Sequence, residues 1–369
     1  MSYPVTLEHL LRELVSHNGS DLHLRAGEPP VMRIHGHLTR REYPVLTSDD
    51  IHAMGTSVMN ERQQEFFAGN LEIDLSHEVE NCARFRVNVF HQRRHVGAVM
   101  RQIPVDIKGI DEMGLPAVLK DISELPRGLV LVTGPTGSGK STTLAAMIKH
   151  INERYYRHIV TIEDPIEFVH KDLKCTVEQR ELGGDTHSFG HALRHVLRQN
   201  PDIVLVGEMR DLETIGLAIT VAETGHLVFG TLHTTDAAQT VDRIIDVFAP
   251  EQQPQIRMQL SIVLQAVVSQ TLLPRNSGGR IAAHEVLVVQ ASTRALIREA
   301  KTFQIPSVIQ AGADQGMVSL DQTLLGLLQK KEVKYEDALS KCSNVVDFIN
   351  RAKRLGLAPA DEGDGTSPA

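Results

Sequence analysis

A glycine-rich segment that ends in lysine, Gly134 to Thr142, constrains this sequence more than any other feature. Its residues, GPTGSGKST, match the pattern GxxxxGK[ST] in full. A short apolar run at 129–132 precedes the segment, and apolar residues at helical spacing follow it from Leu144. The sequence thus has every part of the motif in its expected order: a strand, a glycine-rich loop, Lys-Ser and a helix. It predicts a phosphate-binding loop rather than a turn without a ligand.

The spacing inside this loop fits a nucleoside triphosphate. Glycines let backbone N–H groups curl around an anion, and the N-terminus of the following helix adds partial positive charge. Lys140 can reach the β- and γ-phosphates, and the Ser141 hydroxyl can ligate Mg²⁺. The expected cofactors are therefore ATP and Mg²⁺. The predicted nucleotide-binding residues are Gly134, Pro135, Thr136, Gly137, Ser138, Gly139, Lys140, Ser141 and Thr142.

Apolar runs around the loop indicate the class of fold. Nearly continuous apolar runs recur at 128–132, 158–162, 203–206 and 227–232, and helical patterns separate them. This alternation is typical of a parallel β-sheet that is covered on both faces. The first hundred residues instead show short alternating strands and two helical patterns, the second with Ser48 as the expected N-cap. They predict a separate, small α+β domain.

Composition shifts and turn residues suggest the domain boundaries. Turn signals cluster around Gly109 and Gly114, where we expect a hinge. The last residues are rich in glycine, proline and acids, which predicts disorder. The predicted organisation is an N-terminal domain at 1–105, a linker at 106–125, an ATPase core at 126–290, a C-terminal helical part at 291–355 and a disordered tail at 356–369.

The overall composition excludes several classes of protein. The net charge is −8 and aromatic residues make up 4%, so binding of nucleic acid is not expected. The three cysteines form no CxxC pair, which excludes a four-thiolate zinc site, and no zinc is expected. No apolar run approaches the ~18 residues of a membrane span, and no secretory signal is seen. We therefore expect a cytoplasmic protein.

Two acidic residues follow predicted strands where a bound nucleotide would lie. Glu163 follows the run 158–162, and Glu208 follows the run 203–206. The carboxyl ends of parallel strands meet at one edge of a sheet, where such proteins bind ligands. Asp202 stands at the start of its strand, so we interpret Glu208 as the group that polarises the attacking water rather than as a direct metal ligand. A salt bridge for Glu208 and a capping role for Glu163 are the alternatives.

Two histidines, His226 and His233, flank the apolar run 227–232. His233 stands at the carboxyl end of this strand, where a sensor of the γ-phosphate would be useful, and we include both histidines among the predicted catalytic residues. A structural role is the alternative for each. A metal site is a further alternative, but no third ligand is evident in the sequence.

An arginine pair in the first domain is a further predicted phosphate-binding group. The segment 84–90 alternates, and a turn at 93–94 would place Arg86 directly opposite Arg101 on the next strand. Like charges in this position are unfavourable unless they share an anion. We therefore expect Arg86 and Arg101 to bind the phosphates of ATP, with solvation or pairing with carboxylates as the alternative. A bulge at Gly97 would change this register.

Four segments together resemble the characteristic motifs of the type II/IV secretion ATPases, and they occur in that family's order. The segments are the phosphate loop at 134–142, TIEDPIE at 161–167, DIVLVGEMRD at 202–211, and TGH with TLHT within 224–234. The resemblance implies a RecA-like P-loop ATPase core preceded by a PAS-like domain. It also implies a homohexameric ring in which the paired arginines come from the neighbouring subunit.

Within this family the chain resembles the PilT-type ATPases that retract type IV pili. The segment GSDLHL at 19–24 and the segment RALIREAK at 294–301 look like that branch, although Ser292-Thr293 depart from its pattern. The long N-terminal region and tetracysteine module of assembly-type relatives are not seen. Helical spacing places Arg294 and Arg298 on one face, which is either a docking surface or a solvated face.

The function that this resemblance implies is ATP-driven pilus retraction and twitching motility. The implied partners are an inner-membrane platform protein and, further, the assembly ATPase and an accessory retraction ATPase, which would hold the ring at the inner membrane peripherally. An accessory retraction, DNA-uptake or secretion ATPase is the alternative. Two alternative functions belong to other classes of protein. One is a RecA-like nucleic-acid translocase, and the other is a regulator that binds nucleotide without hydrolysing it.

Overall fold

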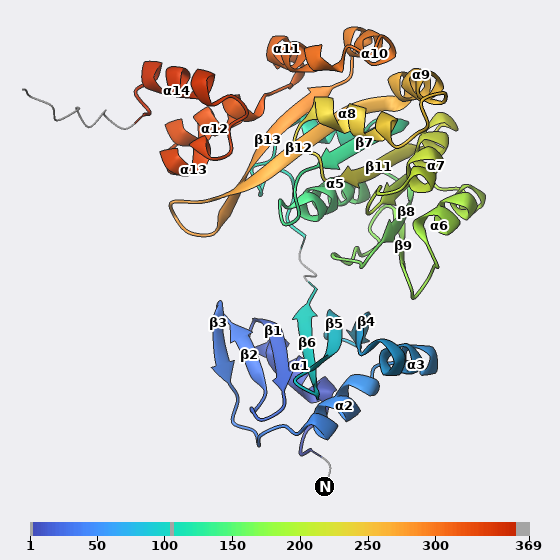
Figure 1. Ribbon diagram of the computed structural model, residues 1–369, viewed down its shortest axis with the longest axis vertical. Coiled ribbons are helices and arrows are strands. Elements are labelled where there is room, and N and C mark those ends of the chain that lie inside the picture. The colour runs from blue at the N-terminus through green and yellow to red at the C-terminus, as the bar shows by residue number, and fades with distance from the viewer. Residues whose placement is uncertain (1–2, 104–106, 359–369) are drawn as a thin grey trace, which may run out of the picture. The chain divides into compact units, whose positions relative to one another are not determined.

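The computed structural model describes residues 3–103 and 107–358 of the chain, which form two compact units (Figure 1). The first unit holds the described residues up to Ile103 together with Pro165–Val169. The second holds those from Ile107 to Asp164 and from His170 onward. The disordered tail was predicted from 356, but Leu357 donates its N–H to the carbonyl of Ala352 at 2.9 Å and packs against a core cluster. The rest of the predicted tail, 359–369, lies outside the described residues.

The first unit is a six-stranded antiparallel sheet with three helices. The strand order is β3-β2-β1-β6-β5-β4. Leu10, Leu11 and Leu14 of α1 are fully buried in one core cluster with Phe85 and Val87 of β5. These contacts confirm the predicted α+β domain. The elements are α1 (Leu7–Ser16), β1 (Gly19–Arg25), β2 (Val31–Ile34), β3 (His37–Arg40), α2 (Ser48–Thr56), α3 (Glu61–Asn70), β4 (Glu72–Val79), β5 (Ala83–Gln92) and β6 (His95–Gln102).

The predicted N-cap of α2 is wrong by one residue. Thr47 is the cap, because its Oγ1 accepts the N–H of Asp50 at 3.2 Å while the Asp50 carboxylate accepts the N–H of Thr47 at 2.9 Å. Ser48 is the first helical residue, and its hydroxyl accepts the N–H of Val96 from β6 at 2.9 Å. Ser48 therefore ties the helix to the sheet instead of capping it.

The hairpin of β5 and β6 has the predicted register. Arg93 and Arg94 form its two-residue turn and both have positive φ, 49° and 66°, the conformation that such tight turns require. Arg86 pairs with Arg101, and Phe90 pairs with Gly97 without a bulge. The two arginines predicted to bind phosphate are therefore cross-strand neighbours.

The second unit is built on a seven-stranded sheet with the order β13-β12-β7-β11-β10-β8-β9. All pairs are parallel except β12 with β13, so the predicted parallel-rich α/β fold is confirmed. The four strands predicted from apolar runs are β7 (Gly128–Thr133), β8 (His158–Glu163), β10 (Ile203–Val206) and β11 (Leu227–Leu232), and three further strands are β9 (Thr176–Glu181), β12 (Leu264–Pro274) and β13 (Arg280–Val288).

Helices cover both faces of this sheet. Alternate residues of β7 separate into two clusters, with Leu129 and Leu131 on one face and Val130 and Val132 on the other. None of the helices described in either unit is both long enough and apolar enough to cross a membrane. The helices are α4 (Val118–Ser123), α5 (Lys140–Arg154), α6 (Phe189–Val196), α7 (Leu212–Glu223), α8 (Ala237–Asp246), α9 (Gln253–Val263), α10 (Ala291–Arg298), α11 (Ile305–Ala311), α12 (Leu320–Gln329), α13 (Tyr335–Leu339) and α14 (Val345–Arg354).

The segment predicted as a linker packs against the second unit from Ile107 onward. Ile110 and Leu115 are buried in the core cluster that includes α5. The Lys149 ammonium of α5 donates to the carbonyl of Ile107 at 2.6 Å. The segment around Gly109 and Gly114 is therefore anchored, and its position does not support the hinge predicted there. Residues 104–106, where the predicted N-terminal domain meets the predicted linker, lie outside the described part of the chain.

Arg294 of α10 holds its own helix in place. Its guanidinium donates to the carbonyls of Ser261 and Ile262, both at 2.6 Å, at the C-terminal end of α9. Burial lowers the pKa of Arg294, and the charge of Arg298 lowers it further. These bonds satisfy helix-end carbonyls. Of the two arginines on the predicted docking face, only Arg298 is exposed, because the guanidinium of Arg294 binds carbonyls of its own chain.

Glu285 on β13 makes folding stability depend on pH. It is 8% exposed, and its Oε1 accepts the N–H of Ala237 at the start of α8 at 2.9 Å. Burial raises its pKa to about 7, with smaller contributions from the charges of Asp236 and Asp321. The folded protein therefore holds this proton more tightly than the unfolded chain does. Stability contributed by the protonated carboxyl is lost as the pH rises from about 4.5 to about 7.

We expect Glu285→Gln to stabilise the protein above pH 7, because the amide keeps an acceptor for Ala237 and carries no charge. The gain should be about 2 kcal/mol at pH 8, a rise of a few degrees in Tm, and should shrink as the pH falls toward about 4.5. Thermal melting of both proteins from pH 5 to pH 8 measures this. Parallel Tm profiles for the two proteins would contradict the assigned pKa.

Candidate active site

The phosphate loop joins the end of β7 to the first turn of α5. Gly134, Gly137 and Gly139 have φ values of 141°, 78° and 91°. These left-handed conformations strain any residue with a Cβ, so the backbone itself requires glycine at these positions. The loop curls directly into the N-terminus of α5, where Lys140 is the first helical residue. N–H groups and the positive end of the helix therefore face the same point.

Most residues of this loop remain accessible to a ligand. Pro135, Thr136 and Gly137 are exposed, and Ser141 and Thr142 are partly exposed. The Lys140 ammonium lies over the loop, donating to the carbonyls of Gly134 at 2.8 Å and Pro135 at 3.2 Å. A bound triphosphate would offer this ammonium stronger anionic partners than these carbonyls.

The two predicted acids lie at the carboxyl ends of neighbouring strands. β8 ends at Glu163, and Gly207 follows β10 and donates its N–H to Ile162 at 2.7 Å. Glu208 is the next residue, so the two carboxylates stand at the same edge of the sheet. The Glu163 carboxylate accepts hydrogen bonds from Thr161 at 2.7 Å and from Gln179 at 3.1 Å.

His233 follows β11 and reaches Glu208. Its Nε2 lies 2.6 Å from Glu208 Oε1, and Arg210 donates to the same oxygen. Burial by itself would raise the pKa of Glu208, but the hydrogen bonds from Arg210 and His233 outweigh it and hold the pKa below its usual value. Glu208 is therefore ionised at neutral pH, as a group that accepts a proton must be.

One cleft of about 620 Å³ brings part of these groups together, without Glu163 or Lys140 in its lining. Thr136 of the phosphate loop lines it together with Glu208 and His233. Arg210 and Arg243 also line the cleft, and neither is among the site residues predicted from the sequence. The signal for Arg210 was its place two residues after Glu208 in the segment 202–211. For Arg243, on α8, the sequence carried no such signal.

His226 does not join this group. It precedes β11, and its Nδ1 lies 3.1 Å from both the Val221 carbonyl and the Thr224 hydroxyl. The six residues of β11 separate it from His233, which is on the order of 20 Å along a strand. The two histidines therefore cannot share a metal ion or act on one nucleotide of their own chain. A catalytic role for His226 stays a prediction about some other contact.

Arg86 and Arg101 form ion pairs in the first unit. Arg101 Nε lies 2.7 Å from Asp21 Oδ1, and Arg86 Nε lies 3.6 Å from Asp74 Oδ1. Pairing with carboxylates, the alternative in the sequence analysis, is thus what the structure contains. Both arginine side chains remain exposed, by 49% for Arg86 and 70% for Arg101, so an anion can still reach them.

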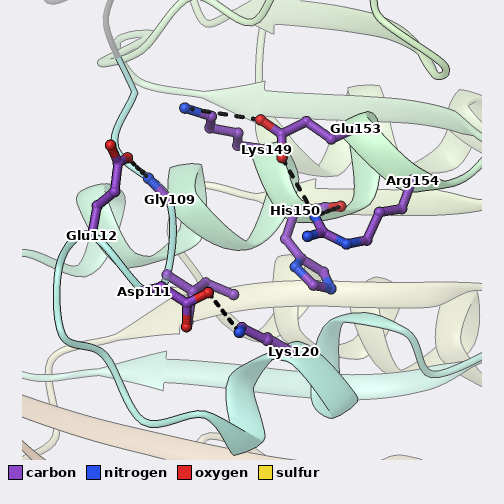
Figure 2. A pocket seen from close by; sticks show the side chains of 9 residues that line it. Gly109, Asp111, Glu112, Lys120, Lys149, His150, Glu153 and Arg154 are labelled. Atoms are coloured by element: carbon purple, nitrogen blue, oxygen red, sulfur yellow. Dashed lines mark hydrogen bonds and ion pairs between the residues drawn. The ribbon is translucent and has the colours of Figure 1, made fainter.

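A second cleft, of about 270 Å³, lies at the far end of α5 (Figure 2). Figure 2 shows Lys149 facing Glu153 and Lys120 facing Asp111 at 2.7 Å. Cations and acids alternate in its lining, so no net positive site for phosphate results. Across residues 3–103 and 107–358, histidines, cysteines and acids nowhere gather in threes with a geometry that could hold a metal ion.

Comparisons with known proteins agree with this geometry. Residues 4–278 match the family model described as type II/IV secretion system protein. The chain is 53% identical to the type IV pilus retractation ATPase PilT of Pseudomonas aeruginosa over 342 residues, which is 93% of this chain and 99% of that protein. It is 41% identical to the type IV pilus ATPase PilU of the same organism, over 96% of this chain and 93% of PilU.

Solved structures give the same picture. A crystal structure of the pilus retraction motor PilT with bound ADP superposes with a TM-score of 0.86 and 43% sequence identity. The match covers 93% of this chain and 98% of that one. The ATPase DotB of Legionella pneumophila superposes with a TM-score of 0.81 at 25% identity, over 97% of this chain and 99% of DotB.

Proposed function

The chain belongs to the type II/IV secretion system protein family, and from this premise we propose that it is an ATP-hydrolysing motor that retracts type IV pili. The observation that carries the proposal is the cleft in which the phosphate loop meets Glu208 and His233. The retraction function rests on the 53% identity to a PilT protein over nearly the whole chain. The presence of bound ADP in the crystal structure of a related motor supports the choice of nucleotide.

The side chains of the phosphate loop and of the strand ends would have separate roles in hydrolysis. Lys140 and the N–H groups of the loop hold the β- and γ-phosphates. Glu208 orients the attacking water and accepts its proton, and His233 senses the γ-phosphate through its bond to Glu208. Bound Mg²⁺ would neutralise the charge that develops on the phosphate oxygens. The Ser141 hydroxyl beside Lys140 is the group that would hold this ion, and Glu163 is the second acid at this edge of the sheet.

We propose a homohexamer in which Arg86 and Arg101 complete the site of the neighbouring subunit. Their exposure and their place on adjacent strands suit a shared anion, which would replace Asp74 and Asp21 as their partner. Contacts that exist only with the γ-phosphate would close the interface, and hydrolysis would release it.

The proposed partners follow from the family. In this proposal a ring that changes shape in steps would act on an inner-membrane platform protein, and the motor would lie in the cytoplasm beside the inner membrane. The assembly ATPase and an accessory retraction ATPase are further partners in this proposal. The 41% identity to PilU over most of the chain keeps an accessory retraction ATPase as the second candidate function.

Deletion of the gene is expected to leave cells with excess surface pili and without twitching motility. The reason is that pilins would be added to the fibre but not withdrawn. Counting pili by electron microscopy and measuring surface spreading tests this, with the wild-type gene and Lys140→Ala as complementing copies. The lysine variant should fail to restore motility. Loss of pili on deletion would identify an assembly motor instead.

Measuring the ATPase activity and the native mass of the purified protein distinguishes a motor from a regulator and from a nucleic-acid translocase. A hexameric mass with phosphate release supports the motor. Nucleotide binding without phosphate release would indicate a regulator. Stimulation of the activity by DNA, with a steep dependence on salt, would revive the nucleic-acid translocase.

A further inference from the structure

Gln270 on β12 underlies the phosphate loop and is not part of the predicted site. β12 pairs in parallel with β7 up to Ser269, which lies opposite Thr133. β7 then leaves the sheet as the loop, while β12 continues. Gln270 is therefore the first residue of β12 beyond the last pairing with β7. It is 3% exposed, although its side chain is polar.

The Gln270 amide binds both halves of the phosphate-binding segment. Its Nε2 donates to the carbonyl of Ser138 in the loop at 2.7 Å. Its Oε1 accepts the hydroxyl of Thr143 in the first turn of α5 at 2.8 Å. Ser138 and Thr143 are themselves 2% and 1% exposed. One side chain thus joins the loop to the helix start from beneath, in a place where water does not compete.

The bond to Ser138 sets the direction of a backbone donor. In a planar trans peptide the C=O of Ser138 and the N–H of Gly139 point in opposite directions. Because the carbonyl points down to Gln270, the N–H of Gly139 points away from β12. An anion can approach the loop only from that outer side, since β12 fills the inner one. Gln270 thereby aims a donor at the ligand without touching it.

The glycines of the loop are also adapted to this strand. A Cβ on Gly134 would lie 2.2 Å from the carbonyl oxygen of Gln270, which rigid backbone cannot accommodate. A Cβ on Gly139 would lie 3.2 Å from Gln270 Nε2. Close packing against β12 is therefore a second reason, besides backbone conformation, for glycine at these two positions.

We propose that Gln270 is a positioning residue that preorganises the phosphate loop for nucleotide binding. The inference rests on the proposed ATPase function. Only a group with one donor and one acceptor satisfies both partners, because the Ser138 carbonyl accepts and the Thr143 hydroxyl donates. Removing the amide leaves a buried carbonyl without its donor and frees the loop to turn its N–H groups away.

Two substitutions at position 270 make a sharp test. Gln270→Met removes both bonds, and we expect the Kd for a fluorescent ADP analogue to rise on the order of 10- to 100-fold at every pH. Gln270→Glu should show the same loss at pH 8, because a carboxylate cannot donate to Ser138. Burial should raise the pKa of the new carboxyl, and its protonated form has one donor and one acceptor. Its affinity should therefore recover toward the wild-type value as the pH falls to about 5.5.

The matched control is Gln265→Met, on the same strand but at the end away from the loop. It should leave the Kd unchanged at all pH values. Equal Kd values for wild type, Gln270→Met and Gln270→Glu would overturn the inference. A loss of nucleotide affinity in Gln270→Glu that is the same at every pH would also overturn it, because an effect of side-chain volume alone does not depend on protonation. A wild-type protein that binds no nucleotide would instead refute the proposed function.

Discussion

Glu208→Gln is expected to lower kcat for ATP hydrolysis by about 10² to 10⁴, while ATP still binds as tightly as in the wild type or more tightly. The substitution keeps the shape of the side chain and an oxygen that faces His233 and Arg210, but removes the ability to take a proton from water. Nucleotide affinity should survive because the phosphate loop, with Lys140, is untouched.

The hydrogen bonds of Glu208 sharpen this expectation. Arg210 and His233 hold the pKa of Glu208 below its usual value, so it remains a carboxylate well into the acidic range. Protonation of Glu208 should therefore lower the wild-type kcat only at pH values below the pKa of an ordinary glutamate. Steady-state phosphate release measures kcat, and binding of a fluorescent ATP analogue measures affinity.

The matched control is Glu213→Gln on α7. Glu213 is an exposed acid that pairs with Arg194 and does not line the cleft, so this variant should keep the wild-type kcat. A kcat for Glu208→Gln within twofold of the wild type would show that another group accepts the proton. Glu163→Gln then identifies which of the two acids has the larger effect.

Arg86→Ala is the second substitution with a large expected effect. Turnover should fall at least about 100-fold, because removal of a cation that stabilises the charge of phosphoryl transfer has effects of this size or larger. Binding of ATP should persist, because the phosphate loop is intact. Folding should also persist, because Arg86 is half exposed and lies a loose 3.6 Å from Asp74. Arg40→Ala, which breaks an exposed pair with Glu28, is the control and should be fully active.

Mixing two inactive variants tests whether the site is completed by a neighbour. In rings assembled at random from Arg86→Ala and Glu208→Gln subunits, roughly one interface in four has an intact Glu208 facing an intact Arg86. Activity should therefore rise on mixing, well above the residual activity of either variant alone. Absence of rescue in rings shown by native mass spectrometry to be mixed would mean that the arginine acts within its own chain.

The local sequence correctly predicted the secondary structure around the phosphate loop. The pattern from 128 to 142 specified a strand, a loop and a helix start, because the loop requires glycines and the strand and helix differ in period. The same reasoning placed Arg86 opposite Arg101, since alternation along two strands and a short turn leave only one register. Strands β9, β12 and β13 were not predicted, because nothing local distinguishes the polar β9 or assigns partners to the other two.

Local patterns did not predict the burial of the Arg294 side chain or the packing of the linker. Helical spacing correctly put Arg294 and Arg298 on one side of a helix, but only the packing of α10 against α9 turned Arg294 inward. Turn residues near Gly109 and Gly114 suggested mobility, yet Ile110 and Leu115 bury that segment against α5. In both places a contact distant in sequence decided the outcome.

The sequence by itself determined the fold class, the phosphate loop and the position of the acids that follow the strands, because these depend on residue type and on spacing within one segment. The tertiary structure alone decided that His233 and Arg210 share one oxygen of Glu208, that His226 stands apart, and that Gln270 supports the loop from beneath. The physical reason is that the order of strands in a sheet is set by packing between segments far apart in the chain. β12, more than a hundred residues after the loop, is neighbour to β7 only once the whole sheet has formed.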